Sequence, residues 1–202
     1  MSMSGMYFPE NATDSERNIK WQKIAEITDA DFGFATPKEK TGKTRFCVRI
    51  LMSNDRGEFC IIKSEKYGYM QLPGGGIDEG ENITEALRRE TEEETGFLIK
   101  DIKPIGYTLE KREDIRNAHD WDQDISYVFS AFPDKEVGTN YMDDEIVEGF
   151  KPIWIKLENF IAEQQNNEGK IESYSGCFSN RRDLEIAKYF KLLKVNNNGR
   201  SK

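Results

Sequence analysis

The feature that most constrains this chain is the stretch from Leu72 to Phe97, where a glycine-rich turn leads straight into an acidic segment. Between Asp78 and Glu94 there are eight carboxylates but only two basic residues, so this segment carries a net charge of −6 out of −8 for the whole chain. Like charges at this density repel one another unless a cation is supplied. A Glu-rich helix is most often a solvated face, but here three consecutive glycines precede it. The stretch therefore predicts a helix that binds a cation.

The spacing of the carboxylates indicates how the cation would be held. Glu90, Glu93 and Glu94 stand at positions i, i+3 and i+4 of a helix expected over residues 82–95, so they project from one face. The opposite side carries the apolar residues expected to face the core, Ile83, Ala86 and Leu87. Carboxylate, carbonyl and water oxygens are the ligands that Mg²⁺ and Mn²⁺ prefer. The cation is therefore expected to be Mg²⁺ or Mn²⁺.

The same residues resemble a known family signature. Gly75, five residues, Glu81, seven residues and then the run from Arg89 to Phe97 (Arg-Glu-Thr-Glu-Glu-Glu-Thr-Gly-Phe) resemble the Nudix box of the Nudix hydrolases. Only Thr91 departs from the pattern, at a packing position where the family usually has an aliphatic residue. The resemblance implies an α/β fold, namely the Nudix-type α/β/α sandwich with a mixed β-sheet. It also implies hydrolysis of a phosphoanhydride bond in a nucleoside diphosphate linked to another group.

The resemblance further implies roles for individual residues. The expected metal ligands are Glu90, Glu94, Glu93 (directly or through water), the backbone carbonyl of Gly74 or Gly75, and Glu81 for a second or third ion. Arg89 is expected to orient the site by pairing with a box carboxylate. Family members differ in the general base, so a later acidic residue is also a candidate; Glu145 is favoured, with Asp144 and Glu148 as alternatives.

Substrate contacts are expected from two other segments. In the charged segment 111–124, Trp121 would stack on a base, and Arg112 or Arg116 would meet phosphate. An ordinary surface loop is an equally good interpretation of this segment. Tyr69, in the run that leads into the glycine turn, is expected to line the pocket. The partner would then be a small nucleotide-like diphosphate.

Composition excludes other classes of partner. The sequence pI of about 5.0 argues against a broad basic surface for duplex nucleic acid. No run has the length of a membrane span and the N-terminus lacks the apolar stretch of a signal peptide, so a cytoplasmic protein is expected. A homodimer is compatible with the sequence. We expect an N-terminal arm or irregular lead-in over residues 1–19, a Nudix hydrolase domain over 20–193 and a disordered tail over 194–202.

Apolar patterning predicts the remaining elements. Strands are expected at 21–27, 46–52, 59–62, 102–109, 125–131 and 150–156, with the second and third joined as a hairpin through the turn at 54–57. Pro152 favours an edge strand or a bulge for the last of these. Helices are expected at 157–165 and from an N-cap at Asn180 to about 193, with Tyr189 and Phe190 packed on the domain.

Two other functions remain open at the level of sequence. One is a non-catalytic Nudix-fold module that senses a ligand, although such modules typically lose box carboxylates and this chain keeps them. The other is an isoprenoid diphosphate isomerase on the same fold. That reaction would require Cys47 or Cys60 to point into the site, whereas both lie in apolar runs that predict burial in the core.

Overall fold

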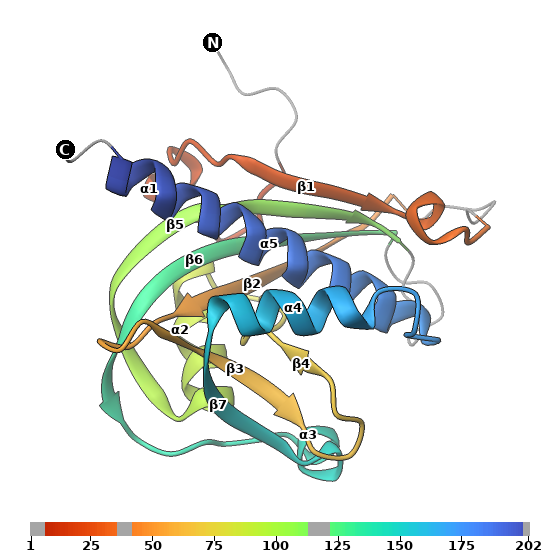
Figure 1. Ribbon diagram of the computed structural model, residues 1–202. Coiled ribbons are helices and arrows are strands. Elements are labelled where there is room, and N and C mark those ends of the chain that lie inside the picture. The colour runs from red at the N-terminus through yellow and green to blue at the C-terminus, as the bar shows by residue number, and fades with distance from the viewer. Residues whose placement is uncertain (1–6, 36–41, 113–121, 200–202) are drawn as a thin grey trace.

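The computed structural model describes residues 7–35, 42–112 and 122–199, which form two β-sheets covered by helices (Figure 1). The larger sheet has the strand order β1-β5-β6-β2, in which β1 runs parallel to β5, β5 antiparallel to β6, and β2 parallel to β6. The smaller sheet has the order β4-β3-β7 and is antiparallel. The strands are β1 (Lys23–Thr28), β2 (Thr44–Met52), β3 (Glu58–Ser64), β4 (Met70–Gln71), β5 (Phe97–Lys111), β6 (Gln123–Glu136) and β7 (Phe150–Lys156).

Helices cover both sides of the larger sheet. They are α1 (Asp14–Arg17), the 3₁₀ turn η1 (Asp29–Phe32), α2 (Ile83–Thr95), α3 (Asp143–Glu148), α4 (Leu157–Asn167) and α5 (Tyr174–Gly199). The buried residues of α2 pack with Val48, Ile50 and Met52 of β2. The residues of α4 and α5 pack with Leu51, on the opposite face of the same strand. The expected α/β fold with a mixed sheet between helical layers is thus confirmed.

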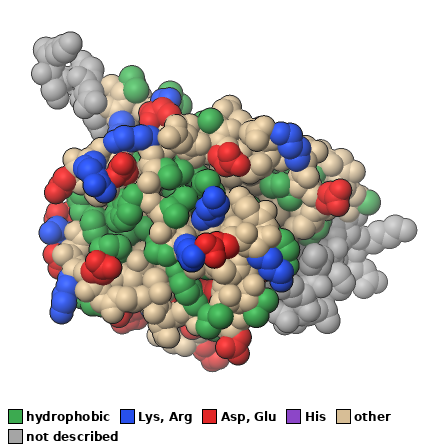
Figure 2. Space-filling model, turned by 60° about the horizontal axis from the view of Figure 1, so that its bottom comes forward, with side chains coloured by type: hydrophobic (Ala, Val, Ile, Leu, Met, Phe, Trp, Pro, Cys, Tyr) green, Lys and Arg blue, Asp and Glu red, His purple; other side chains and the backbone are tan. Residues whose placement is uncertain are grey.

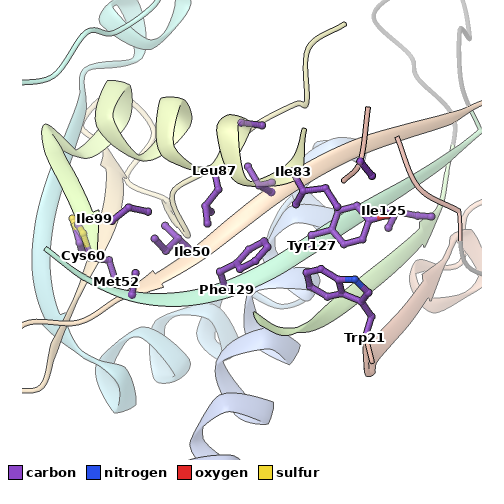
Figure 3. Close-up of a cluster of buried hydrophobic side chains, with 14 residues drawn as sticks. Trp21, Ile50, Met52, Cys60, Ile83, Leu87, Ile99, Ile125, Tyr127 and Phe129 are labelled. Atoms are coloured by element: carbon purple, nitrogen blue, oxygen red, sulfur yellow. The ribbon is translucent and has the colours of Figure 1, made fainter. Parts of the chain in front are cut away.

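Strand β6 shows how alternation divides the core. Ile125, Tyr127 and Phe129 point to the α2 side, whereas Val128 points to the α5 side. On the α2 side, the Trp21 ring lies 4.9 Å from Tyr127 and 5.4 Å from Phe129, measured between ring centroids (Figure 3). These rings belong to the same buried cluster as the apolar face of α2.

The predicted hairpin between residues 46–52 and 59–62 is wrong. The turn at Asn54 forms, but β2 and β3 then diverge into different sheets and share only the bridge between Ser53 and Phe59. The free edge of β2 pairs instead with the glycine turn: the amides of Val48 and Ile50 donate to the carbonyls of Gly75 and Pro73. Because this edge is taken, β2 cannot also accept β3 along its length.

The last helix also differs from its prediction. Asn180 is not an N-cap; α5 begins at Tyr174, where the Ser173 hydroxyl accepts the amide of Gly176. Asn180 lies inside the helix, and its side-chain amide donates to the Gln164 carbonyl of α4. The helix also continues to Gly199, into the segment 194–202 for which disorder was expected.

The other outer segments pack on the domain as well. Strand β7 has the predicted bounds and pairs only with β3, so Pro152 does lie in an edge strand. The lead-in expected as an arm contains α1, whose buried Glu16 accepts both the amide and the hydroxyl of Thr84 at the start of α2. Figure 2 shows one face of the molecule, on which basic and acidic side chains are interspersed around hydrophobic ones. Within the described ranges, no helix combines the length and apolar character that crossing a membrane requires.

Candidate metal and catalytic site on helix α2

Helix α2 is defined by its caps and its apolar face. At its start, the Asn82 side chain accepts the amide of Glu85, while the Glu85 carboxylate accepts the amide of Asn82. At its end, Gly96 adopts the left-handed conformation with φ of 75°, as expected for the C-terminal cap. Ile83, Ala86 and Leu87 are fully buried. This orientation directs the carboxylates of Glu90 and Glu94 toward the glycine turn and that of Glu93 toward Arg89.

Thr91, the one residue that departs from the family pattern, is accommodated without an unpaired polar group. Its side chain is fully buried, and its hydroxyl donates to the carbonyl of Leu87 at 2.6 Å. A hydroxyl that bonds the carbonyl four residues earlier is satisfied within its own helix. The departure therefore leaves the packing of α2 intact.

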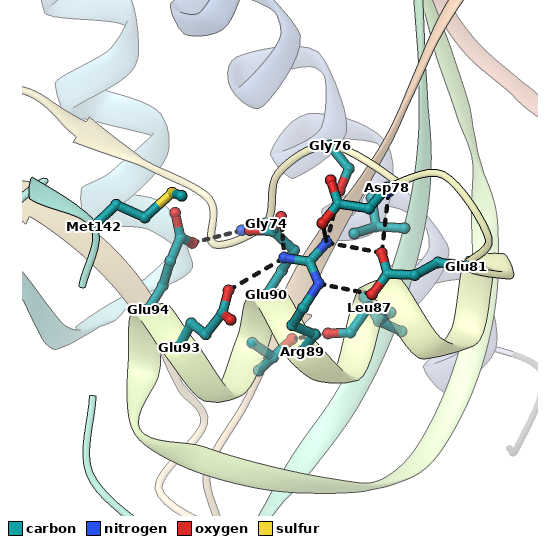
Figure 4. Close-up of polar contacts among 12 residues, drawn as sticks. Gly74, Gly76, Asp78, Glu81, Leu87, Arg89, Glu90, Glu93, Glu94 and Met142 are labelled. Carbon is teal, nitrogen blue, oxygen red and sulfur yellow. Dashed lines mark hydrogen bonds and ion pairs between the residues drawn. The ribbon is translucent and has the colours of Figure 1, made fainter. Parts of the chain in front are cut away.

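Arg89 lies at the centre of the acidic cluster (Figure 4). Its guanidinium binds Glu81 through two bonds, Nε to Oε1 at 2.7 Å and Nη2 to Oε2 at 2.8 Å. Its Nη1 contacts Glu90 at 2.8 Å and Glu93 at 3.2 Å, and its Nη2 donates to the Gly76 carbonyl at 3.0 Å. The predicted pairing of Arg89 with a box carboxylate is therefore present, and this one residue joins the glycine turn to the helix.

The single guanidinium does not balance the charge around it. The hydrogen bonds that Arg89 donates to Glu81, followed by its hydrogen bond to Glu90 and the charges of both carboxylates, raise the pKa of Arg89. Burial raises the pKa of Glu90, and the contact with Arg89 offsets this only in part. The cluster thus retains an excess of carboxylates, which a divalent cation would relieve.

Glu94 occupies the most buried position of the cluster. Its side chain is 4% exposed and accepts the amide of Gly74 at 2.7 Å. Burial, together with the charge of Glu90, raises its pKa to about 8, although the bond from Gly74 acts in the opposite direction. In the absence of a cation, Glu94 is therefore mostly protonated at neutral pH.

The glycine turn is shaped by close contacts that side chains would prevent. A Cβ on Gly74, whose φ is +129°, would lie 2.2 Å from the carbonyl oxygen of Val48. A Cβ on Gly75 would lie 2.4 Å from Oε2 of Glu90, so its backbone packs directly on that carboxylate. The Gly75 carbonyl accepts the amide of Val48. Coordination of a metal by the carbonyl of Gly74 or Gly75 stays a prediction.

The acidic segment after β6 forms the short helix α3 beside the cluster. Glu145 accepts the amide of Met142 at 2.7 Å and so caps this helix, and its charge contributes to the raised pKa of Glu94. Glu148 accepts the hydroxyl of Tyr69 at 2.6 Å. Tyr141 donates to the backbone carbonyl of Glu94 at 3.0 Å. The structure thus brings the favoured candidate base, Glu145, to the side of Glu94, but its role in the reaction stays a prediction.

Of the predicted substrate residues, the two that the structure describes, Tyr69 and Arg112, have separate partners. The hydroxyl of Tyr69 donates to the carboxylate of Glu148, the last residue of α3. Arg112 is 8% exposed and lies in an ion network with Glu110, at 3.2 Å, and Asp124, at 3.5 Å. A phosphate contact by Arg112 would require this network to open. Arg116 and Trp121 lie outside the described residues, as does most of the segment 111–124.

Sequence reasoning missed two buried residues near the site. Arg49, in the middle of β2, is 7% exposed, and its charge acts on both Glu90 and Glu94. Asp183 of α5 accepts the amide of Leu72, the residue just before the glycine turn, at 2.8 Å. A charged residue within the apolar run 46–52 was a signal for Arg49, since Arg is rarely buried without a partner. No sequence signal connected Asp183 to the turn.

The side chains of the acidic cluster offer the kind of ligand atom that a hard divalent cation prefers. Glu81, Glu90 and Glu93 offer only oxygen atoms, and their carboxylates outnumber the positive charge beside them. Across residues 7–35, 42–112 and 122–199, no group of three His, Cys, Asp or Glu side chains is arranged to hold a metal ion. Glu81, Glu90 and Glu93 bind the Arg89 guanidinium instead. A cation would have to draw some of them away from the guanidinium.

Comparisons with known proteins point to one family. A family model described as the NUDIX domain matches residues 43–176. An RNA pyrophosphohydrolase from Wolbachia sp. subsp. Brugia malayi is 42% identical over 134 residues, which cover 61% of this chain and 82% of that protein. An RNA pyrophosphohydrolase from Vibrio atlanticus is 38% identical over 77 residues, which cover 34% of this chain and 44% of that protein.

The structural neighbours are more distant. A NUDIX hydrolase from Nitrosomonas europaea is 18% identical with a TM-score of 0.48, over 69% of this chain and 88% of that one. A MutT protein from Bacillus halodurans is 19% identical with a TM-score of 0.47, over 59% of this chain and 72% of that one.

Proposed function

This chain belongs to the NUDIX domain family, and on that premise we propose that it is a divalent-metal-dependent hydrolase of a phosphoanhydride bond in a nucleotide-like diphosphate. The observation that carries the proposal is the arrangement around Arg89. Glu81, which lies just before α2, meets Glu90 and Glu93 of α2 there, and the Gly76 carbonyl of the glycine turn binds the same guanidinium. Mg²⁺ or Mn²⁺ bound to these carboxylates would polarise the phosphoryl oxygens and provide an activated water.

The chain's own residues would orient the groups that take part. Arg89 holds Glu81, Glu90 and Glu93 within reach of one another, which limits the motion of each carboxylate. The Gly74 amide fixes Glu94, whose high pKa in the metal-free protein would fall once a cation replaces its proton. Glu145, held at the start of α3 beside Glu94, is the candidate that we propose for accepting a proton from the attacking water.

The acidic character of the protein and the names of its relatives both bear on which substrates should be tested. An acidic protein with the carboxylates of α2 at its site would receive phosphates through metal ions rather than through a basic surface. Two relatives are called RNA pyrophosphohydrolases, so an RNA 5′ end that carries a pyrophosphate linkage joins nucleotides and nucleotide sugars among the substrates to be tested. The chain spans only 44% of the Vibrio relative, so the activity of the whole relative is carried over only as a proposal.

The sequence and the structure each weaken one of the two alternative functions. A sensor would be expected to lose box carboxylates, whereas this chain keeps Glu81, Glu90, Glu93 and Glu94. An isomerase would need a reactive cysteine at the pocket. Cys47 and Cys60 are fully buried, and burial raises the pKa of each thiol to about 12. Neither thiol is therefore available for acid–base chemistry at neutral pH.

The test is a substrate screen with paired variants. Nucleoside triphosphates, nucleotide sugars, dinucleoside polyphosphates and 5′-triphosphate RNA are incubated with Mg²⁺ or Mn²⁺, and release of phosphate, pyrophosphate or nucleoside monophosphate is followed. Glu94→Gln keeps the size and the bond to Gly74 but removes the charge, so we expect turnover to fall by about 10²-fold or more.

Glu92→Gln is the matched control for this screen. Glu92 lies on the same helix but is exposed, so its substitution should leave turnover within about twofold of the wild type. Equal turnover in wild type and Glu94→Gln, on a substrate that the screen identifies, would contradict the assignment of α2 as the catalytic helix.

A further inference from the structure

The glycine turn is held by bonds that come from three different parts of the fold. Strand β2 contributes the amides of Val48 and Ile50 and the carbonyl of Phe46, which pair with Gly75, Pro73 and Ile77. Helix α2 contributes Glu94, which accepts the amide of Gly74, and Arg89, which donates to the carbonyl of Gly76. A further contact comes from the C-terminal helix: Asp183 accepts the amide of Leu72, across 111 positions of sequence. This contact fixes the point at which the chain enters the turn.

The Asp183 carboxylate is itself firmly placed. It is fully buried, and its second oxygen accepts Nε of Arg182 at 2.8 Å. Arg182 is 2% exposed and lies 3.5 Å from the Glu110 carboxylate of β5. A buried charged acceptor makes a shorter and stronger bond to a backbone amide than a neutral one does. The amide of Leu72 is therefore attached through Asp183 to both α5 and the larger sheet.

The position of the Leu72 backbone determines where the glycine turn lies in the proposed site. Pro73 follows it, and its ring fixes φ of the one residue that separates Leu72 from Gly74. Gly74 and Gly75 then contact Glu94 and Glu90 at close range. Glycine restricts the backbone torsions only weakly. The turn therefore depends on hydrogen bonds at its ends to keep Gly74 beside Glu94 and Gly75 beside Glu90.

We propose that Asp183 is a positioning residue for the hydrolysis reaction, acting through the Leu72 amide to set where the glycine turn meets Glu90 and Glu94. The inference rests on the proposed function of the α2 carboxylates. It assigns to the C-terminal helix a part in the site that its distance in sequence from the box does not suggest.

A neighbouring residue provides the matched control. Gln164 of α4 is 1% exposed, and its Nε2 donates to the carbonyl of Met70 at 3.0 Å. This bond also ties a C-terminal helix to the chain before the turn, but it reaches β4 rather than the turn itself. Loss of Gln164 should destabilise the protein without loosening the turn.

The test compares Asp183→Ala, Asp183→Asn and Gln164→Ala on the substrate that the screen identifies. We expect Asp183→Ala to lower kcat by about 10-fold or more with KM within about twofold, because the reacting groups are misplaced while substrate binding persists. Asp183→Asn keeps an oxygen that can accept the Leu72 amide, so kcat should recover to within about threefold of the wild type. Gln164→Ala should lower Tm but leave kcat unchanged.

A second readout does not depend on activity. Amide hydrogen exchange of the peptide covering residues 72–77, measured by mass spectrometry, should accelerate in Asp183→Ala and, to a smaller extent, in Asp183→Asn, but not in Gln164→Ala. Faster exchange in a protein for which no substrate is found would support the anchor while the proposed function fails. Exchange equal to wild type in Asp183→Ala, or an equal loss of kcat in Gln164→Ala and Asp183→Ala, would overturn the proposal.

Should Asp183→Ala fail to fold, Asp183→Asn carries the test alone. The neutral amide holds Leu72 less tightly than the carboxylate, so faster exchange over residues 72–77 at unchanged KM is expected. Exchange identical to the wild type in Asp183→Asn would then overturn the positioning role.

Discussion

At the scale of single residues, Gly75 links the fold to the chemistry most closely. Its φ is not in the left-handed region, so an alanine there would not strain the backbone; the obstacle is the Glu90 carboxylate, 2.4 Å from the position of a Cβ. The carboxylate can rotate away at small cost in stability. Gly75→Ala should therefore leave Tm close to that of the wild type while lowering turnover by about 10²-fold, the effect of a misplaced group of about 1 Å.

Gly76→Ala serves as the control for this prediction. A Cβ on Gly76 would meet Nη2 of Arg45 at 3.3 Å, at the end of a long side chain that can adjust by a few tenths of an ångström. We expect a smaller loss of turnover than in Gly75→Ala. If both substitutions reduce turnover equally, the contact with Glu90 is not what requires a glycine at position 75.

Glu94 gives the metal-free protein a predictable dependence on pH. Burial raises its pKa from 4.5 to about 8 in the folded state, so between these pH values the folded protein binds more protons than the unfolded chain. Its contribution to the free energy of unfolding is therefore full below about pH 4.5 and is lost as the pH rises to about 8. Urea unfolding in a chelating buffer at several pH values measures this slope. Glu94→Gln should flatten it, and an equally steep slope in the variant would show that another group is responsible.

At the scale of secondary-structure elements, the box helix was predictable and its partners were less so. Helix α2, its cap at Gly96 and its buried face follow from local signals that agree with one another. Strand β7 was also predicted with its observed bounds. The pairing of β2 was not, because a run that is apolar at every position except Arg49 shows neither which face nor which edge it uses. Its edge is taken by the glycine turn, a contact that periodicity does not reveal.

The start of α5 was missed because its inward face is mostly polar. From Tyr174 to Asp183 the buried positions are Phe178, Asn180, Arg182 and Asp183, so a single apolar residue rather than a stripe marks the helix there. Arg182 pairs with Asp183, whereas Asn180 and Asp183 bind backbone groups of other segments. The residues that support the site from outside the box were therefore the least accessible to sequence reasoning.

The C-terminal half of α5 is expected to stabilise the domain through Phe190. Its ring is partly buried and meets Phe59 edge-on, with 5.7 Å between ring centroids. Phe190→Ala should lower the free energy of unfolding by about 2 kcal/mol, less than the 3–5 kcal/mol of a fully buried Phe. Leu192→Ala, at a 62% exposed position of the same helix, should change it by less than about 0.5 kcal/mol. Urea unfolding curves measure both, and a negligible loss for Phe190→Ala would indicate an exposed stripe with an interaction role.

At the scale of the whole molecule, segments from both ends of the described chain converge on one helix and one turn. Glu16 of α1 binds the start of α2, and Asp183 of α5 binds the start of the glycine turn. The sheet lies between them and presents β2 to the turn. Hydrogen bonds from α1, α5 and β2 thus fix the positions of α2 and the glycine turn. A site in which clustered carboxylates lower the stability of the fold requires such support. A homodimer remains a prediction, which sedimentation equilibrium would test.

The central claim is that the carboxylates of α2 hold a divalent cation, and thermal melting with and without Mg²⁺ or Mn²⁺ tests it most directly. A cation that binds only the folded protein raises its stability by RT ln(1 + [L]/Kd). Relief of the repulsion between Glu90 and Glu93 is one contribution to that affinity. We expect Tm to rise with millimolar metal in the wild type and in Glu92→Gln, and to rise much less in Glu90→Gln and Glu94→Gln. A wild-type Tm that millimolar metal leaves unchanged, or an equal rise in all four proteins, would contradict the account.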